Sequence, residues 1–124
     1  MAMDLPFVVA LTEQASANGT ITLSYQVPSN QEFHISDYGF VADGAFSLTG
    51  IRDSEGNRYT SASNNNPLLS TMLKNTANQN NTVDLFPIPL QLKGSRTIYF
   101  DFLDTSGSAN DIWLALIGKR LVNV

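Results

Sequence analysis

The sequence predicts an all-β protein, an antiparallel β-sandwich of the jelly-roll kind with about eight strands. Three observations predict it. Apolar and polar residues alternate with a period of two in several segments, and turn residues separate these segments at intervals of about eight to twelve positions. Residues 19–27 also align without gaps on residues 94–102. Two similar segments from opposite halves of the chain suit a jelly roll, whose terminal strands meet in one sheet. We expect one domain over residues 1–124, because this length supports a single core.

The first half of the chain supplies the first four expected strands. Residues 1–12 are mostly apolar, and we expect them to form an arm or edge strand used in assembly. In residues 20–27 every second residue is apolar, which is typical of a strand with one buried face. Residues 33–35 alternate in the same way, as do residues 46–49 until Gly50, where we expect a bulge or bend.

The last third of the chain contains two further strands. Residues 96–102 alternate again, and we expect Ile98, Phe100 and Phe102 to point inward. Residues 111–122 are apolar on both parities. Such a strand is either central to the domain or covered by a partner.

Turn residues punctuate these runs. An Asn-Gly pair at 18–19 precedes one strand, and an Asp-Gly pair at 43–44 is typical of a type I′ hairpin. Residues 53–57 and 106–110 are predicted to be two more hairpin loops. The Asn-rich region 61–82 contains an apolar run that could be a short helix or a strand, and whether it is ordered stays open.

Composition excludes several functions. The chain has 7 basic and 11 acidic residues and no basic cluster, which argues against nucleic-acid binding. It has no cysteine, and His34 is its one histidine, expected to face solvent on its strand without a catalytic role. We expect no enzyme activity and no cofactor. No apolar run is long enough to span a membrane and no signal peptide is visible, so we expect synthesis in the cytosol.

Two binding alternatives remain open from the residues. Asp53, Glu55 and Asn57 offer oxygen ligands at alternate positions and form a weak calcium candidate, although turn formation explains the same residues. Amide-rich loops with nearby aromatic residues would also suit a carbohydrate-binding module, with a glycan as partner. For that module we expect the exposed aromatic residues to be Tyr38, Tyr59 and Tyr99, and we expect Trp113 in the core or an interface.

A surplus of apolar residues favours assembly over catalysis. Residues 3–11, 68–73 and 112–122 supply more apolar side chains than one inner face of a small sandwich requires. We therefore expect a homo-oligomer, or packing on a larger assembly. The candidate interface residues are Leu5, Phe7, Val8, Leu68, Leu69, Met72, Trp113 and Leu121.

The chain resembles a group of virion proteins. A proline-bearing segment at 85–95, an alternating strand at 97–102 and a final apolar strand at 112–118 are similar in order and spacing to small tailed-phage virion proteins. Residues 46–53, followed by 57–59 and the Asn-Pro pair at 66–67, are similar to the same group, and the resemblance covers about residues 5 to 122.

Within that group, the pattern resembles capsid decoration (cement) proteins with a jelly-roll fold. This resemblance implies a virion protein that forms a dimer or trimer and clamps neighbouring subunits of the major capsid protein from outside. It transfers no site residues. A phage tail or fibre component, such as a receptor-binding tip or a lectin-like module, stays open as the alternative.

Overall fold

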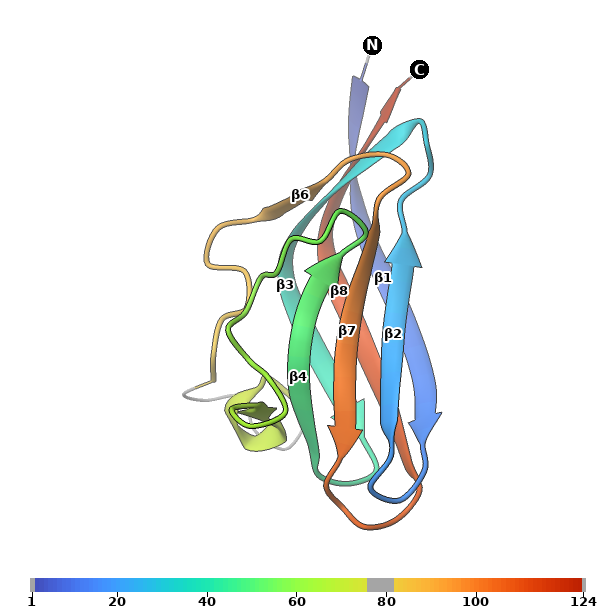
Figure 1. Ribbon diagram of the computed structural model, residues 1–124. Helices are drawn as coiled ribbons and strands as arrows, with labels where there is room; N and C mark the ends of the chain where they lie inside the picture. The colour runs from blue at the N-terminus through green and yellow to red at the C-terminus, as the bar shows by residue number, and fades with distance from the viewer. Residues whose placement is uncertain (1, 76–81, 124) are drawn as a thin grey trace.

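The computed structural model describes residues 2–75 and 82–123, which fold into two antiparallel four-stranded sheets packed face to face (Figure 1). In sheet A the strand order is β1-β8-β3-β6, and in sheet B it is β2-β7-β4-β5. The strands are β1 (Ala2–Ala15), β2 (Thr20–Gln26), β3 (Gln31–Ala42), β4 (Phe46–Asp53), β5 (Leu68–Leu69), β6 (Leu90–Leu92), β7 (Thr97–Asp104) and β8 (Asn110–Asn123).

The strand order is that of a jelly roll. From β1 to β4 and from β6 to β8, strands that follow one another in the chain lie in opposite sheets, and β1 pairs with β8 along its whole length. The predicted fold class is confirmed. So is the central position of the last strand, because β8 lies between β1 and β3.

Two of the predicted hairpins are wrong. The Asp-Gly pair at 43–44 joins β3 of sheet A to β4 of sheet B, and residues 106–110 join β7 of sheet B to β8 of sheet A. Both loops therefore cross the end of the sandwich. Turn-forming residues suit such a connection between sheets as well as they suit a hairpin within one sheet. The loop at 53–57 does form a tight antiparallel turn, with Arg52 opposite Arg58 and Gly56 at a φ of 87°.

The two segments that align in sequence are neighbours in space. β2 and β7 pair over their length, with Ile21 opposite Phe102 and Leu23 opposite Phe100. The predicted inward residues of β7 are buried, and β2 keeps its polar parity exposed. The Asn-Gly turn before β2 is also confirmed, because Asn18 takes the positive φ of 57° that such turns need.

A β-bulge changes which residues of β3 face the core. The register against β8 shifts between Ile35 and Asp37, so Ser36 is an extra residue. Before the bulge the odd-numbered residues Phe33 and Ile35 point into the core. After the bulge the even-numbered residues Tyr38 and Phe40 point into the core. Tyr38 is 1% exposed. The expectation that it is exposed is therefore wrong, because one extra residue moves every later side chain to the opposite face.

The core is rich in aromatic residues from both sheets. The rings of Phe40, Phe46 and Phe102 lie 5.3 to 5.6 Å apart and contact one another at steep angles. Gly50 marks a second bulge, between Leu48 and Gly50 of β4, as its place in the alternation predicted.

Lys74 and Asn75 lie along the open edge of β3, beside Phe40. The apolar run within 61–82, predicted to be a short helix or a strand, contains both, since the short β5 is followed by a 3-10 helix, η1 (Ser70–Met72). The backbone N–H of Phe40 donates a hydrogen bond of 3.0 Å to the carbonyl of Lys74, which covers the edge of β3 beyond β6. The rest of that expectation concerns residues 76–81 and lies outside the described residues.

Candidate functional site

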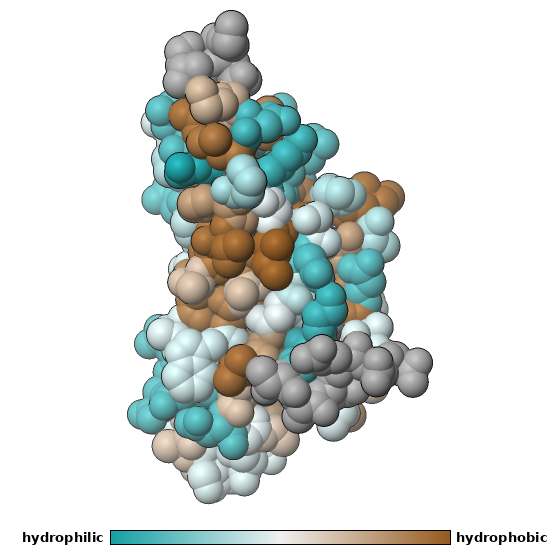
Figure 2. Space-filling view, turned by 180° about the vertical axis from the view of Figure 1, so that it is seen from behind, coloured by the Kyte–Doolittle hydropathy of each residue, from teal (hydrophilic) through white to brown (hydrophobic). Residues whose placement is uncertain are grey.

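The outer face of sheet A is the first candidate site. The outward side chains of β1, β8 and β3 form rows across the three strands, and the register defines which residues share a row. We call these rows the apolar face, and Figure 2 shows apolar atoms gathered across its middle. The rows are Val8–Ile117–Asp37, Ala10–Ala115–Gly39 and Thr12–Trp113–Val41.

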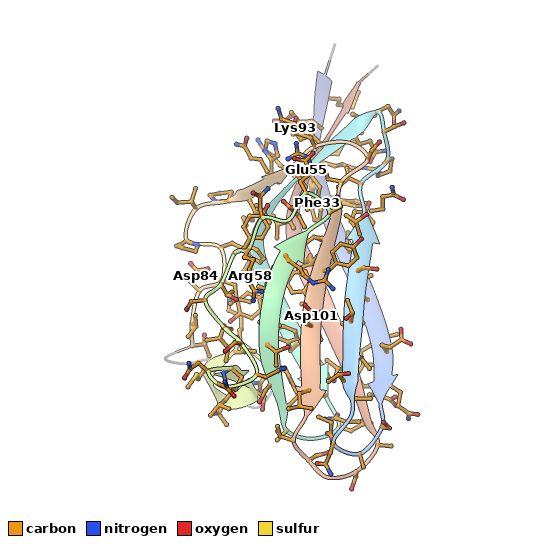
Figure 3. All side chains as sticks on the ribbon, viewed as in Figure 1. Phe33, Glu55, Arg58, Asp84, Lys93 and Asp101 are labelled. Atoms are coloured by element: carbon orange, nitrogen blue, oxygen red, sulfur yellow. The ribbon has the colours of Figure 1, made fainter. Side chains whose placement is uncertain are left out.

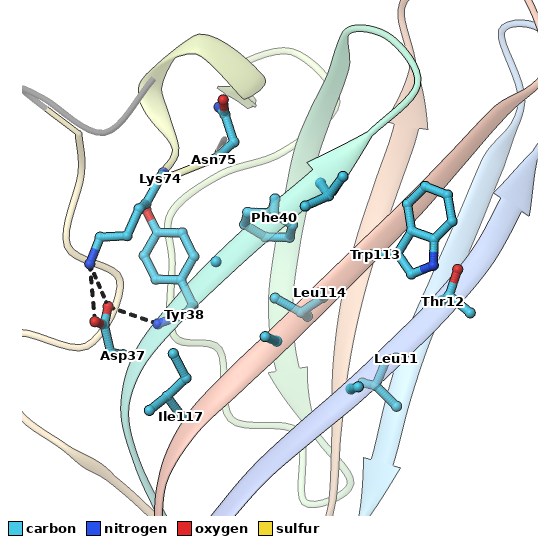
Figure 4. Close-up of a pocket in the computed structure, with 14 residues that line it drawn as sticks. Leu11, Thr12, Asp37, Tyr38, Phe40, Lys74, Asn75, Trp113, Leu114 and Ile117 are labelled. Carbon is cyan, nitrogen blue, oxygen red and sulfur yellow. Dashed lines mark hydrogen bonds and ion pairs between the residues drawn. The ribbon is translucent and has the colours of Figure 1, made fainter. Parts of the chain in front are cut away.

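The middle row makes a trough in the apolar face. Ala10, Ala115 and Gly39 are small, and rows on one face of a sheet are about 6.6 to 6.8 Å apart. Larger side chains therefore stand on both sides of a low floor. The hollow measures about 480 Å³ and is mostly apolar (Figure 4). The exposed residues that line it include Val41 (44%), Trp113 (42%) and Ile117 (39%), and Val8 (59%) lies beside Ile117 in the same row.

An ion pair closes one end of the trough. Lys74 Nζ lies 2.9 Å from Asp37 Oδ1, and the Asp37 carboxylate also accepts the backbone N–H of Tyr38 (Figure 4). Burial opposes ionisation of Asp37, but the Lys74 contact and this N–H outweigh it and lower the pKa of the carboxyl. The same bond raises the pKa of Lys74. Asp37 and Lys74 therefore neutralise each other, and Asp84, which also acts on Lys74, adds one negative charge beside this pair.

The structure places the predicted interface residues in three regions. Val8 and Trp113 stand on the apolar face, so the core alternative for Trp113 is wrong. Leu69 (44% exposed) and Met72 (40% exposed) lie around η1. Phe7 is half-buried and points between the sheets, with its ring 5.5 Å from that of Phe33. Leu5, Leu68 and Leu121 are also half-buried.

The outer face of sheet B carries a second, polar site. Asp101 on β7 accepts hydrogen bonds from Arg52 Nε (2.9 Å), Arg52 Nη2 (3.3 Å) and Thr22 Oγ1 (2.7 Å). Arg58 lies near the same carboxylate (Figure 3). Burial opposes ionisation of Asp101, but the bonds from Arg52 and Thr22 and the charge of Arg58 lower its pKa. These groups surround a hollow of about 400 Å³, the polar hollow, lined by Thr20, Ile21, Thr22, Thr49, Arg52, Arg58, Ser63, Asn64, Asp101 and Phe102.

The weak calcium candidate is a turn. Asp53 Oδ1 accepts the backbone N–H groups of Glu55 (2.9 Å) and Asn57 (3.1 Å), and Oδ2 accepts bonds from Asn57 Nδ2 and the Tyr59 hydroxyl. Burial opposes ionisation, but these donors lower the pKa of Asp53 to about 2. Glu55 pairs with Arg96 at 2.9 Å instead. Within residues 2–75 and 82–123 no group of three or more His, Asp or Glu could hold a metal ion.

The sequence predicts that His34, Tyr59 and Tyr99 are exposed, but all three are partly buried. His34 lies on the outward parity of β3, but its side chain is only 16% exposed, with Nε2 2.8 Å from Glu32 Oε1. Tyr59 and Tyr99 are half-buried. The Arg52 guanidinium lies 4.5 Å from the centre of the Tyr99 ring and covers one of its faces. Tyr38, Tyr59 and Tyr99 therefore do not form the exposed aromatic surface expected for a carbohydrate-binding module.

Sequence reasoning missed the polar hollow. Its charged residues come from β4, the following turn and β7, so no local motif joins them. One signal was available, because Asp101 occupies an outward position of a strictly alternating strand.

Comparisons with family models, curated proteins and solved structures found no match to this chain. In the described part of the chain, no helix is long and apolar enough to cross a membrane. The case for a function therefore depends on the two outer faces of the sandwich.

Proposed function

We propose that this chain is a structural protein that self-associates through the apolar face of sheet A. The observation that carries the proposal is the exposure of Val8, Val41, Trp113 and Ile117 in the two rows that flank the trough on one sheet. Contiguous apolar side chains in contact with water are unfavourable, and such patches typically mark protein interfaces. Aromatic residues such as Trp113 are also enriched in the centres of interfaces.

A second copy of the chain is the occupant that fits this surface. The apolar face carries both a projecting indole and a trough, so it can be complementary to itself, as a two-fold interface requires. Two acidic residues beside it are paired within the chain, Asp37 with Lys74 and Asp4 with Lys119 at 3.2 Å. These pairs reduce the electrostatic repulsion between two copies that each have a net charge of −4.

We further propose that the oligomer decorates the outside of a phage head. The sequence resemblance to cement proteins and the jelly-roll strand order support this role. A decoration protein also needs a surface for the capsid subunit. Leu69, Met72 and Val83 (39% exposed) supply separate exposed apolar side chains, and the backbone N–H of Val83 donates to the Met72 carbonyl at 2.7 Å.

Light scattering coupled to size-exclusion chromatography tests self-association. We expect the wild-type chain to elute as a dimer at micromolar concentration and neutral pH, since a two-fold contact through one face joins two copies. Ile117→Lys places a charge in the apolar face and should give a folded monomer. Ser24→Lys adds the same charge on the outer face of β2, where Ser24 is exposed, and should leave the oligomer intact. A monomeric wild-type chain contradicts the proposal.

Co-sedimentation with phage heads tests the location in the virion. We expect the wild-type protein to pellet with expanded heads and Met72→Lys to stay in the supernatant while it still forms oligomers. A self-associating protein that ignores heads but pellets with tails would identify a tail or fibre component instead. Binding to neither particle contradicts a virion role and leaves self-association standing.

A further inference from the structure

The polar hollow contains two arginines that face each other. Arg52 and Arg58 form an antiparallel bridge across the 53–57 turn, which places their side chains on the same side of sheet B. Like charges directly opposite each other in a sheet cost stability. Asp101 neutralises one of them through its two bonds with Arg52. The charged groups that line the hollow therefore leave one excess positive charge, in a chain whose net charge is −4.

Arg58 is the cation available to a ligand. Its Nη2 donates one hydrogen bond of 3.0 Å to the carbonyl of Ala62, and the residue is exposed. A Cβ at Gly50 would lie 3.3 Å from this Nη2 and 3.6 Å from Asp101 Oδ2, so the missing side chain of Gly50 leaves room for the guanidinium against the sheet. A guanidinium presents its N–H groups in a planar fork, which suits a carboxylate in a bidentate arrangement.

The rest of the lining is neutral and rich in hydroxyl groups. Thr20, Thr22, Thr49, Ser63 and Asn64 border the hollow, which is about 400 Å³ in volume. Hydroxyls and amides can donate to and accept from the hydroxyls of a sugar, and the fixed Asp101 carboxylate adds an acceptor. Only two cations line the hollow, and the basic track that a nucleic-acid backbone needs is absent from the sequence.

We propose that the polar hollow binds an acidic sugar unit of a surface glycan, with Arg58 on the sugar carboxylate and Asp101 and Thr22 beside its hydroxyls. This inference goes beyond self-association, because it assigns a ligand to the opposite sheet. The two faces of the sandwich then have separate tasks, one against protein and one against carbohydrate.

Titration with defined saccharides tests the proposal. The probes are a trisaccharide of galacturonic acid and sialyllactose, and the controls are galactose, lactose and sodium sulfate. Affinity is measured by calorimetry, and amide shifts in NMR locate the ligand. We expect at least one acidic probe to bind and to shift the amides of residues 49–52, 58 and 101. Neutral sugars should bind at least ten times more weakly.

Matched charge variants make the test specific. Arg58→Gln should weaken binding of the acidic probe at least tenfold, whereas Lys93→Gln should leave it unchanged. Both variants remove one positive charge, but Lys93 is exposed and lies away from Asp101 (Figure 3). Near-UV circular dichroism checks that both variants fold.

Three outcomes overturn the inference. They are no binding of either acidic probe, equal affinity for sulfate, and an Arg58→Gln variant that binds like the wild type. Repeating the titration with Ile117→Lys separates the two proposals. Glycan binding by a monomer supports the hollow without self-association, and an oligomer that binds no glycan supports self-association alone.

Discussion

Asn110 donates a hydrogen bond of 3.0 Å from Nδ2 to Asp104 Oδ1, and both residues are buried where the β7–β8 loop crosses between the sheets. The same amide group donates to the carbonyls of Gly44 and Ala45, and its oxygen accepts the N–H of Gly44. One side chain therefore holds together the two loops that cross this end of the sandwich. Hydrogen bonds from Ser106, together with those from Asn18 and Asn110, lower the pKa of Asp104.

Asn110→Ala should destabilise the fold by about 2 to 4 kcal/mol, because it removes the four hydrogen bonds that this buried side chain makes with Gly44, Ala45 and Asp104. Asn110→Asp should destabilise the fold more than Asn110→Ala as the pH rises above about 4, since it then places two ionised carboxylates against each other. Urea denaturation of both variants between pH 4 and 8 measures the effect. An Asn110→Asp variant whose stability does not fall with pH would contradict this role of the Asp104 contact.

The lowered pKa of Asp53 predicts that the folded chain loses stability in acid. Its pKa is about 2 in the folded chain and near 3.9 when unfolded, so its contribution is present above pH 4 and is lost as the pH falls toward 2. The contribution is about 1 to 2 kcal/mol. Tyr59→Phe removes one donor to this carboxylate and should shrink the loss measured between pH 4 and 2. The carboxyl resonance of Asp53 in NMR should then titrate at a higher pH than in the wild type.

Gly118 and Gly39 should respond in opposite ways to alanine. A Cβ at Gly118 would lie 1.8 Å from the backbone oxygen of His34, whereas one at Gly39 meets nothing within 4 Å. Gly118→Ala must push β8 away from β3 and should cost about 3 kcal/mol or more. Gly39→Ala should be neutral, or stabilising by up to about 1 kcal/mol. Thermal unfolding compares them, and equal melting temperatures would contradict the close approach.

Trp113 allows a test of self-association without mutation, because it is the single tryptophan of the chain. Its side chain is 42% exposed in the isolated chain and should lose water contact when two apolar faces meet. We expect its fluorescence emission to move to shorter wavelength as the protein concentration rises through the association range. Ile117→Lys should keep the emission at longer wavelength at every concentration. An emission maximum that is independent of concentration in an oligomer that dissociates on dilution would place the interface elsewhere.

The alternation of residue types predicts most of the strands correctly. In β2 and β7 it also predicts which face is buried, because neither strand contains an inserted residue. In β3 the prediction fails after Ser36, since a bulge leaves no mark in the residue types around it. The exposure of Tyr38 was misjudged for that reason.

Sheet membership and the polar hollow depend on contacts between distant residues. The Asp-Gly pair at 43–44 has the chemistry of a turn, but that chemistry does not show whether the next strand stays in the same sheet. Arg58 and Asp101 are 43 positions apart in the sequence, and they meet only because the 53–57 turn returns the chain beside β4, which pairs with β7. The apolar face was partly predictable, because residues 111–122 are apolar on both parities.

The position of β8 between β1 and β3 also constrains the order in which the chain can fold. Its contacts with β1 join residues about a hundred positions apart, so they form slowly compared with local contacts. During synthesis on a ribosome, β1 has no neighbour to pair with until β8 emerges, and β3 has only the short β6. The edges of β1 and β3 that later pair with β8 are exposed to other nascent chains throughout that interval, so we expect sheet A to be open to wrong strand pairing until synthesis of β8 is complete.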